Sequence, residues 1–265
     1  MIGDRLYPVE AHRMKRSRSM LAPIAMAALA GGVAPRTASA VDLIADLGGP
    51  AGFGTGFLAE NDDSSSAEID ISRGFPGGLR YFAGTYRSIF VNNNGNITFR
   101  GAVGQFTPTP FPIADQPMIA PFWADVDTRG GGRPGRNGVW WDIRPGQVVI
   151  TWHNVGYFGS HVDRLNSFQI VLRGGTEMDE GQFEVEFRYA RCEWTTGDAS
   201  GGSNGRGGTP AQAGFDAGNR RDSRVLPGSR TAGVLRLCRT SNVGEPGIWR
   251  FLITNGRPMR SPARE

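Results

Sequence analysis

The eight residues from Gln182 to Tyr189 alternate strictly between polar and apolar side chains. Successive side chains of a β-strand point to opposite faces of its sheet, so the pattern predicts a strand with one buried face and one solvent face. Glu184 and Glu186 belong to the polar set, and we expect both on the solvent face. No segment after residue 40 sustains the 3.6-residue period that indicates a helix. The chain is therefore expected to fold from strands.

Turn residues between apolar runs predict hairpins. Asn94-Gly95 accepts the positive φ angles of a type I′ turn and separates two strand-like runs. Pro145-Gly146 separates the next two, and a glycine-rich acidic turn joins a third pair. The expected strands are 88–92 with 96–99, 139–143 with 147–153, and 167–172 with 182–189, followed by closing strands at 234–238 and 248–253. Strands that pair mainly with sequence neighbours predict an all-β fold, an antiparallel, jelly-roll-like β-sandwich with long Gly/Pro-rich loops.

Residues 1–40 have the organisation of a secretory signal peptide preceded by an N-terminal extension. A basic segment leads into an apolar run over 20–34, and the small residues Ala38-Ser39-Ala40 follow. A short membrane anchor is the alternative, but a proline and a glycine pair interrupt the run. The run is also shorter than the ~20 apolar residues of a spanning helix. We expect cleavage before Val41, no membrane span afterwards, and a protein that is secreted or held at the cell surface.

The remaining chain is expected to contain one large domain. Residues 41–66 form a glycine-rich and polar lead-in, 67–255 the β domain, and 256–265 a disordered tail. Of the 29 basic and 25 acidic residues, the first 40 positions hold six and two, which leaves 23 of each. A neutral domain without clustered positive charge gives no reason to expect a nucleic-acid partner.

The segment from Met118 to Arg129 combines a strand of buried type with closely spaced carboxylates. Its apolar run ends near Trp123. Asp125 and Asp127 follow two positions apart, and they lie on one side of the strand if the chain remains extended. The segment therefore predicts a core strand that ends in an acidic tip.

This same segment carries a family resemblance. Ile119-Ala-Pro-Phe-Trp-Ala-Asp-Val-Asp127 resembles the most recognisable run of the nidogen-like (NIDO) domain, and Trp194-Thr-Thr-Gly-Asp-Ala-Ser-Gly-Gly202 resembles a run of its second half. With further motifs in the expected order, similarity extends from about Ile89 to Ile253. The resemblance implies an extracellular cell-matrix adhesion module without an established catalytic activity. We expect a secreted single-domain member behind a bacterial-type leader, with an extracellular protein or glycan as its partner.

Cys192 and Cys238 are the two cysteines of the chain. An even number of cysteines in an exported chain favours pairing. The resemblance places both beside strands of the second half, so we expect a disulfide between them.

The residues that could support catalysis have simpler explanations. His153 and His161, the histidines after residue 40, have no metal-ligand spacing. Glu184 and Glu186 could act as the carboxylate pair of a glycosidase, but a regular strand explains them as solvent-facing. We therefore assign no catalytic residue and no established cofactor.

Four tryptophans could form a platform that stacks on sugar rings: Trp140, Trp141, Trp152 and Trp194. Trp140 and Trp141 must point to opposite faces of a strand, so at least one of them is expected in the core. Core packing is the simpler role for most of this set. The alternative function is a secreted carbohydrate-binding or polysaccharide-hydrolysing β-sandwich.

Two roles are open for Asp125 and Asp127. Aspartates at turns commonly accept hydrogen bonds from nearby backbone N–H groups, and this capping role is the simpler one. The alternative is a calcium site, because calcium binds several oxygen ligands, with Asp198 as the candidate third ligand. Strand residues i and i+2 stand ~6.6 Å apart, whereas two oxygens on one calcium are at most ~5 Å apart. A calcium site would require both carboxylates to lean inward or the strand to bend.

Overall fold

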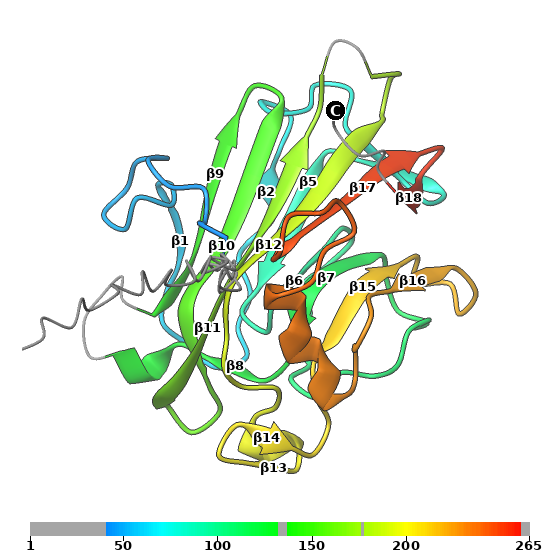
Figure 1. Ribbon diagram of the computed structural model, residues 1–265. Helices are drawn as coiled ribbons and strands as arrows, with labels where there is room; N and C mark the ends of the chain where they lie inside the picture. The colour runs from blue at the N-terminus through cyan, green and yellow to red at the C-terminus, as the bar shows by residue number, and fades with distance from the viewer. Residues whose placement is uncertain (1–40, 132–136, 176–177, 261–265) are drawn as a thin grey trace, which may run out of the picture. The chain divides into compact units, whose positions relative to one another are not determined.

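The larger of two sheets contains the longest strands of the protein. A computed structural model describes residues 41–131, 137–175 and 178–260, which lie in one compact unit. The strands follow the order β1-β9-β10-β11-β12-β17-β18, with β8 paired to β10, and every pairing is antiparallel (Figure 1). Their bounds are β1 Gly56–Leu58, β8 Val126–Asp127, β9 Gly138–Arg144, β10 Gln147–Tyr157, β11 His161–Arg173, β12 Phe183–Cys192, β17 Ile248–Thr254 and β18 Arg257–Arg260.

The smaller sheet has the order β16-β15-β7-β6-β5-β2 and is also antiparallel. Its strands are β2 Ile69–Asp70, β5 Ser88–Asn92, β6 Asn96–Thr98, β7 Met118–Trp123, β15 Gln212–Asp216 and β16 Ser223–Val225. The remaining elements are the hairpin strands β3 Leu79–Tyr81, β4 Gly84–Tyr86, β13 Gly202–Ser203 and β14 Arg206–Gly207, and the 3₁₀ helices η1 Arg129–Gly131, η2 Asp198–Ser200 and η3 Ala232–Cys238.

The two sheets pack against each other, and aromatic side chains fill the space between them. Phe187 of β12 stacks on Phe215 of β15, with ring centroids 5.2 Å apart. Tyr189 of β12 is buried, and its hydroxyl donates a hydrogen bond to the carbonyl of Pro121 in β7 at 2.8 Å. The apolar half of the alternation in β12 thus faces the core. The structure confirms the predicted all-β sandwich.

Local predictions from turn residues are largely confirmed. All three expected hairpins form. The type I′ turn expected at Asn94-Gly95 is wrong, because only Gly95 has a positive φ, 78°, and a type I′ turn needs one at both positions. Asn92 pairs with Asn96, so residues 93–95 form a three-residue loop. The expected strand at 234–238 is wrong, because this segment belongs to η3. Its buried residues Val234 and Leu237 are three apart, which places them on one face of a helix with three residues per turn. The hydroxyl of Thr231 caps this helix by accepting a hydrogen bond from the amide of Gly233.

Ordered strands extend beyond the expected domain limits at both ends. Gly56–Leu58, in the expected lead-in, pairs with β9, while Leu47 and Phe53 are buried. Arg257–Arg260, in the expected disordered tail, pairs with β17. Each segment satisfies backbone groups that an open sheet edge leaves unpaired. The predicted signal peptide, residues 1–40, lies outside the described residues.

The outer face of the larger sheet is covered by the N-terminal segment. Val149 of β10 and Val171 of β11 are buried against Leu47. The side chain of Gln169 on β11 donates to the carbonyl of Ile44 and accepts from its amide, each at 2.8 Å. Part of the expected lead-in therefore forms a third layer over part of the sheet.

One prediction about β12 is wrong. Glu184 and Glu186 were expected in solvent, but both are buried. Arg173 donates to each of them, at 3.3 and 3.1 Å, and Arg188 donates to Glu186 at 2.7 Å. Arg250 also pairs with Glu186. The polar positions thus form a buried ion-pair cluster instead of a solvent face.

In the part of the chain that the structure describes, no helix is long and apolar enough to cross a membrane.

Candidate functional site

Asp125 lies where the chain passes from the smaller sheet to the larger one, between β7 and β8. Asn94 holds this bend: its carbonyl accepts from the amide of Ala124 at 3.1 Å, and its side-chain oxygen accepts from the amide of Val126 at 2.9 Å. The carbonyl of Asp125 accepts from the amide of Phe158 at 3.1 Å. Because the chain bends here, Asp125 and Asp127 do not share one extended strand.

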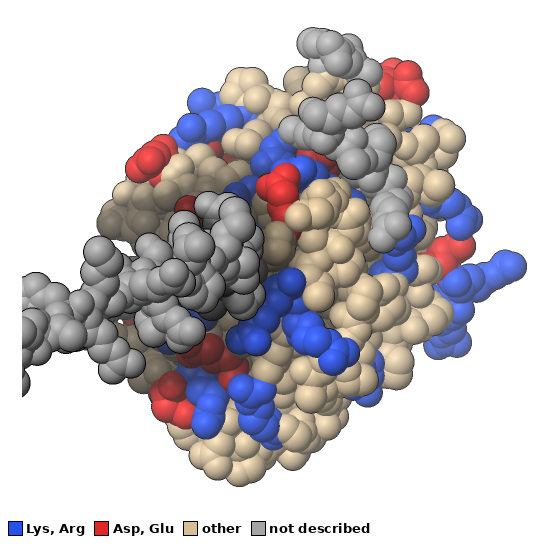
Figure 2. Space-filling model, viewed as in Figure 1, with Lys and Arg blue, Asp and Glu red and all other residues tan. Residues whose placement is uncertain are grey.

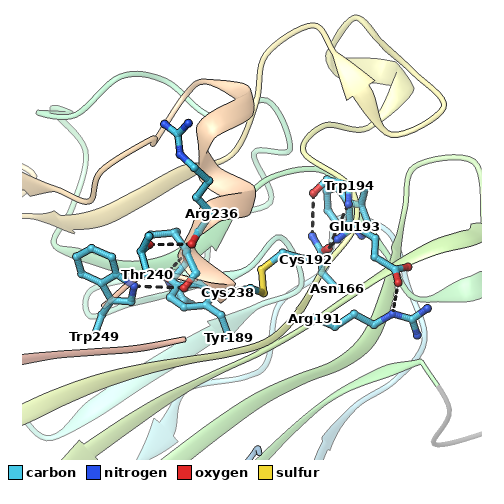
Figure 3. The surroundings of a disulfide bond; sticks show 12 residues. Asn166, Tyr189, Arg191, Cys192, Glu193, Trp194, Arg236, Cys238, Thr240 and Trp249 are labelled. Atoms are coloured by element: carbon cyan, nitrogen blue, oxygen red, sulfur yellow. Dashed lines mark hydrogen bonds and ion pairs between the residues drawn. A yellow bond between two sulfur atoms is a disulfide. The ribbon is translucent and has the colours of Figure 1, made fainter. Parts of the chain in front are cut away.

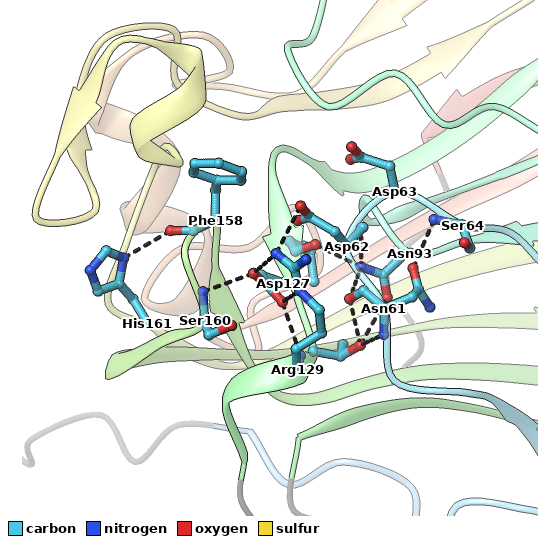
Figure 4. Close-up of polar contacts among 12 residues, drawn as sticks. Asn61, Asp62, Asp63, Ser64, Asn93, Asp127, Arg129, Phe158, Ser160 and His161 are labelled. Carbon is cyan, nitrogen blue, oxygen red and sulfur yellow. Dashed lines mark hydrogen bonds and ion pairs between the residues drawn. The ribbon is translucent and has the colours of Figure 1, made fainter.

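Asp127 has the capping role. One carboxylate oxygen accepts from the amide of Arg129 at 2.9 Å, and the other accepts from the amide of Ser160 at 2.8 Å (Figure 4). The guanidinium of Arg129 binds the same carboxylate, with its closest contact at 2.6 Å. Burial acts to raise the pKa of Asp127, but the hydrogen bonds from Arg129 and Ser160 outweigh it and lower the pKa. Both oxygens are satisfied within the chain.

Asp198 does not join the predicted ligand set. It begins η2, and its side chain is exposed. Among the described residues, the carboxylates that gather around Asp125 are those of Asp62 and Asp63. One oxygen atom of each of these three residues lies within 4.8 Å of the others. This group of carboxylates shares only Asp125 with the expected ligand set of Asp125, Asp127 and Asp198.

Asp125 is the buried member of this carboxylate cluster, which we define as Asp62, Asp63 and Asp125. Its side chain is 1% exposed, and neither of its carboxylate oxygens has a hydrogen-bond partner among the described residues. Burial, followed by the negative charges of Asp62 and Asp63, raises the pKa of Asp125 to about 7. Burial, with Asp127 and Asp63, also raises the pKa of Asp62 to about 6, against the lowering effect of Arg129. The fold thus concentrates negative charge in a place that disfavours it.

A run of buried asparagines positions the loop that supplies Asp62 and Asp63. The side chain of Asn93 donates to the carbonyl of Asp62 at 2.5 Å, and that of Asn94 donates to the carboxylate of Asp63 at 2.9 Å. On the other side, the side chain of Arg129 donates to the carboxylate of Asp62 at 2.9 Å. The loop is fixed by specific contacts to Arg129 of η1 and to the β5–β6 turn.

Gly197 closes the cluster from the side of the second family motif. A Cβ atom built on this glycine would lie 2.4 Å from a carboxylate oxygen of Asp125. A side chain therefore cannot replace the hydrogen atom here without displacing the carboxylate. The two family motifs therefore meet where Gly197 lies against Asp125. Asp198, the predicted ligand, directly follows Gly197 in the sequence.

The predicted disulfide is present. Cys192 at the end of β12 and Cys238 at the end of η3 are bonded, with Cα atoms 6.2 Å apart (Figure 3). Beside it, the side-chain oxygen of Asn166 accepts from the amide of Glu193 at 2.6 Å, while its nitrogen donates to the carbonyl of Trp194 at 3.1 Å. The bridge fastens η3 to the larger sheet.

A pocket of about 470 Å³ opens beside this bridge, and four of its nine lining residues are arginines: Arg191, Arg206, Arg236 and Arg239. Arg191 pairs with Glu193 at 2.8 Å, whereas Arg206, Arg236 and Arg239 are exposed. Figure 2 shows basic side chains gathered on the lower middle of the face in view. The lining has more positive than negative side chains and is suited to an anionic group.

The other candidate residues have structural surroundings. Trp140, Trp152 and Trp194 are buried, and only Trp141 of the four tryptophans is half-buried, so these residues do not form an open stacking platform. The ring of His153 packs on Phe53 with centroids 4.7 Å apart, and burial lowers its pKa. His161 is exposed, and its ring nitrogen contacts the carbonyl of Phe158 at 2.8 Å.

An antiparallel β-sandwich closed by a disulfide is typical of proteins that fold outside the cytosol. The family model of the nidogen-like domain matches residues 87–137 and 143–255. The chain belongs to this NIDO family. It is an extracellular, matrix-associated module, secreted or held at the cell surface.

Curated relatives support this assignment. α-Tectorin of Gallus gallus is 38% identical over 226 residues, which cover 75% of this chain, and α-tectorin of Mus musculus is 35% identical over 226 residues, covering 72%. Nidogen of Drosophila melanogaster is 29% identical over 214 residues, covering 69%. The matches span only 10% of each α-tectorin and 15% of the nidogen. These relatives are animal proteins and give no support to the bacterial-type origin expected from the leader. No solved structure matches the chain significantly.

Proposed function

We propose that this chain is a non-catalytic adhesion module that binds an acidic segment of an extracellular-matrix protein. Its membership of a family that includes α-tectorin and nidogen is the observation that carries this proposal. The matched region is a small part of those proteins. The proposal therefore concerns binding by this domain alone.

The arginine-lined pocket is the proposed docking surface. Arg206, Arg236 and Arg239 line this pocket, and none of the three forms an ion pair with another described residue. Guanidinium groups bind carboxylates through two parallel hydrogen bonds, which favours Asp- or Glu-rich segments. The adjacent disulfide holds the pocket wall in place, and a rigid surface loses less entropy on binding.

Binding is favoured over polysaccharide hydrolysis by the surroundings of the acidic pair. Glu186 is inaccessible and paired with three arginines, and Glu184 is buried beside it. A glycosidase carboxylate must reach the bond it cleaves. The alternative hydrolase function therefore loses its candidate catalytic residues.

The test measures binding of the secreted chain to immobilised matrix proteins, to an oligo-glutamate peptide and to sulfated glycans. We expect saturable binding to a matrix protein, competition by oligo-glutamate, and weakening as salt rises. The double substitution Arg236→Ala with Arg239→Ala should reduce binding about tenfold or more.

A control with the same loss of charge is Arg220→Ala with Arg221→Ala, because both residues are exposed and lie outside the pocket. This control should bind like the wild type. Equal losses in the two double variants would contradict the assigned surface. Binding to sulfated glycans alone would replace the protein partner with a glycan, and hydrolysis of a polysaccharide would contradict the non-catalytic function.

A further inference from the structure

We infer that Asp62, Asp63 and Asp125 form a calcium site that joins the 61–63 loop to the β7–β8 bend. One carboxylate oxygen of each of these three residues lies within 4.8 Å of those of the other two. Two oxygens bound to one calcium ion at ~2.4 Å are separated by at most ~5 Å. The cluster therefore has the dimensions of a single calcium coordination sphere.

The unpartnered atoms of the cluster are the independent observation that points to a ligand. Asp125 is 1% exposed, yet both of its carboxylate oxygens are without hydrogen bonds from described residues. One oxygen of Asp62 is likewise buried and unpartnered. Buried polar groups in native proteins are almost always satisfied, and unsatisfied ones call for an ion, a water or another partner. Three such oxygens at one point favour a cation over neutral partners.

The charge balance supports the same conclusion. Asp62, Asp63, Asp125 and Asp127 bring four carboxylates together, and Arg129 is the cation that contacts two of them. Arg129 offsets one of these four negative charges, and the remaining charge lies mainly on Asp63 and Asp125, which form no ion pair with a described residue. A divalent ion offsets most of it.

The ligand atoms decide which cation fits. All three are carboxylate oxygens, and calcium takes six to eight oxygens in flexible geometry, which leaves places for water. Zinc and other transition metals favour nitrogen or sulfur ligands, and the cluster contains no histidine or cysteine. Extracellular calcium modules bind in the range ~10⁻⁴–10⁻³ M, and an extracellular protein meets the ion in that range.

Binding would fasten a loop that is distant in sequence to the core. Asn93 and Asn94 already hold the loop through neutral hydrogen bonds, and the ion would add a charged link to Asp125. Gly197 lies against the same carboxylate, so the ion would also steady the turn that precedes η2. The proposed site is therefore a structural clamp where β7, the 61–63 loop and the second family motif meet.

The experiment titrates calcium into the full secreted chain after treatment with a chelator, by calorimetry, and follows the melting temperature in parallel. We expect one ion per chain, a Kd of ~10⁻⁴–10⁻³ M, a higher melting temperature in calcium, and a weaker response to magnesium. Asp125→Asn should abolish the calcium response. Asp63→Asn, which retains an acceptor for Asn94 on an exposed residue, should weaken binding about tenfold or more.

Two exposed aspartates outside the cluster, changed as Asp115→Asn and Asp198→Asn, provide matched controls and should bind calcium like the wild type. If Asp125→Asn does not fold, Asp63→Asn decides the question. The proposal is overturned if 10 mM calcium produces neither heat nor a thermal shift in the wild type. It is equally overturned if Asp63→Asn and Asp125→Asn retain wild-type affinity, or if Asp198→Asn loses binding as they do.

Discussion

Two buried carboxylates of this protein lie in opposite electrostatic surroundings. Glu186 is inaccessible, and Arg173, Arg188 and Arg250 bind its two oxygens. Asp125 is 1% exposed, but the charged groups nearest to it are other carboxylates. Removing an ion from water costs several kcal/mol unless paired charges and hydrogen bonds offset it. Glu186 is compensated by the chain itself, whereas Asp125 is not compensated by any described residue.

The difference follows from where each residue lies. The arginines around Glu186 belong to β11, β12 and β17, three adjacent strands whose register places them beside it. Asp125 lies at a bend between two sheets, and its neighbours come from a loop about 60 positions earlier in the chain. A sheet can supply partners by register alone. A junction of loops has no such regular source, and at this junction we propose an external ion.

The largest effect is expected from Glu186→Gln. The substitution leaves three guanidinium groups around a neutral amide, and breaking a buried pair in this way costs about 3–5 kcal/mol. Urea unfolding measures the loss. Glu180→Gln, an exposed glutamate in the β11–β12 turn, should change the free energy of unfolding by less than about 0.5 kcal/mol. A loss below about 1 kcal/mol for Glu186→Gln would show that the ion-pair cluster is not a main support of the sheet.

The disulfide is the second internal fastening of β12. It closes a separation of 46 residues, for which chain entropy gives at most about 4 kcal/mol. The double substitution Cys192→Ser with Cys238→Ser should therefore lower the urea midpoint without changing calcium affinity, because the bridge and the carboxylate cluster are separate. Labelling of free thiols in the native secreted protein would contradict the bridge itself.

Acid should weaken the Glu186 cluster specifically. Burial acts to raise the pKa of Glu186, but the arginines, Arg173 first, outweigh it and lower the pKa from near 4.5 to about 2. Between these values the unfolded chain binds the proton and the folded chain does not. Stability from this group is therefore complete above about pH 4.5 and lost as pH falls towards 2, by about 3 kcal/mol in all. Subtracting the pH profile of Glu186→Gln from that of the wild type isolates this effect, and parallel profiles would contradict it.

The sequence predicts the sandwich well because its information is local. The alternation in 182–189 and the hairpin signal at Asn94-Gly95 depend on neighbouring residues, and both the strand and the hairpin form. The same alternation fails for Glu184 and Glu186, because it reports which side chains share a face but not what covers that face. Arginines of three strands cover Glu186, and one of them, Arg188, also donates to the carbonyl of Asp42, 146 positions earlier in the chain.

The candidate site is less predictable for the same reason. Spacing and the family motif single out Asp125, and the structure retains it. The carboxylate of Asp127 binds Arg129, two positions later, and does not join the cluster. Asp62 and Asp63 lie in a polar stretch that looks like a connector. The available signal is the acidic pair itself, together with the run of three asparagines at 92–94, of which Asn93 and Asn94 bind the pair. Only the long-range packing of the loop unites them.

The contrast between Asp125, which needs an ion, and Glu186, which does not, is tested most directly by the free energy of unfolding of Asp125→Asn and Glu186→Gln at pH 8. Each variant is measured in chelator and in 5 mM calcium at matched ionic strength. Removing a charge from the carboxylate cluster relieves repulsion, so Asp125→Asn should be more stable than the wild type in chelator, by about 1 kcal/mol or more. In calcium its sign should reverse, because the wild type gains binding energy that the variant cannot. Glu186→Gln should be destabilised equally in both conditions. Destabilisation of Asp125→Asn by the same amount with and without calcium would contradict the account.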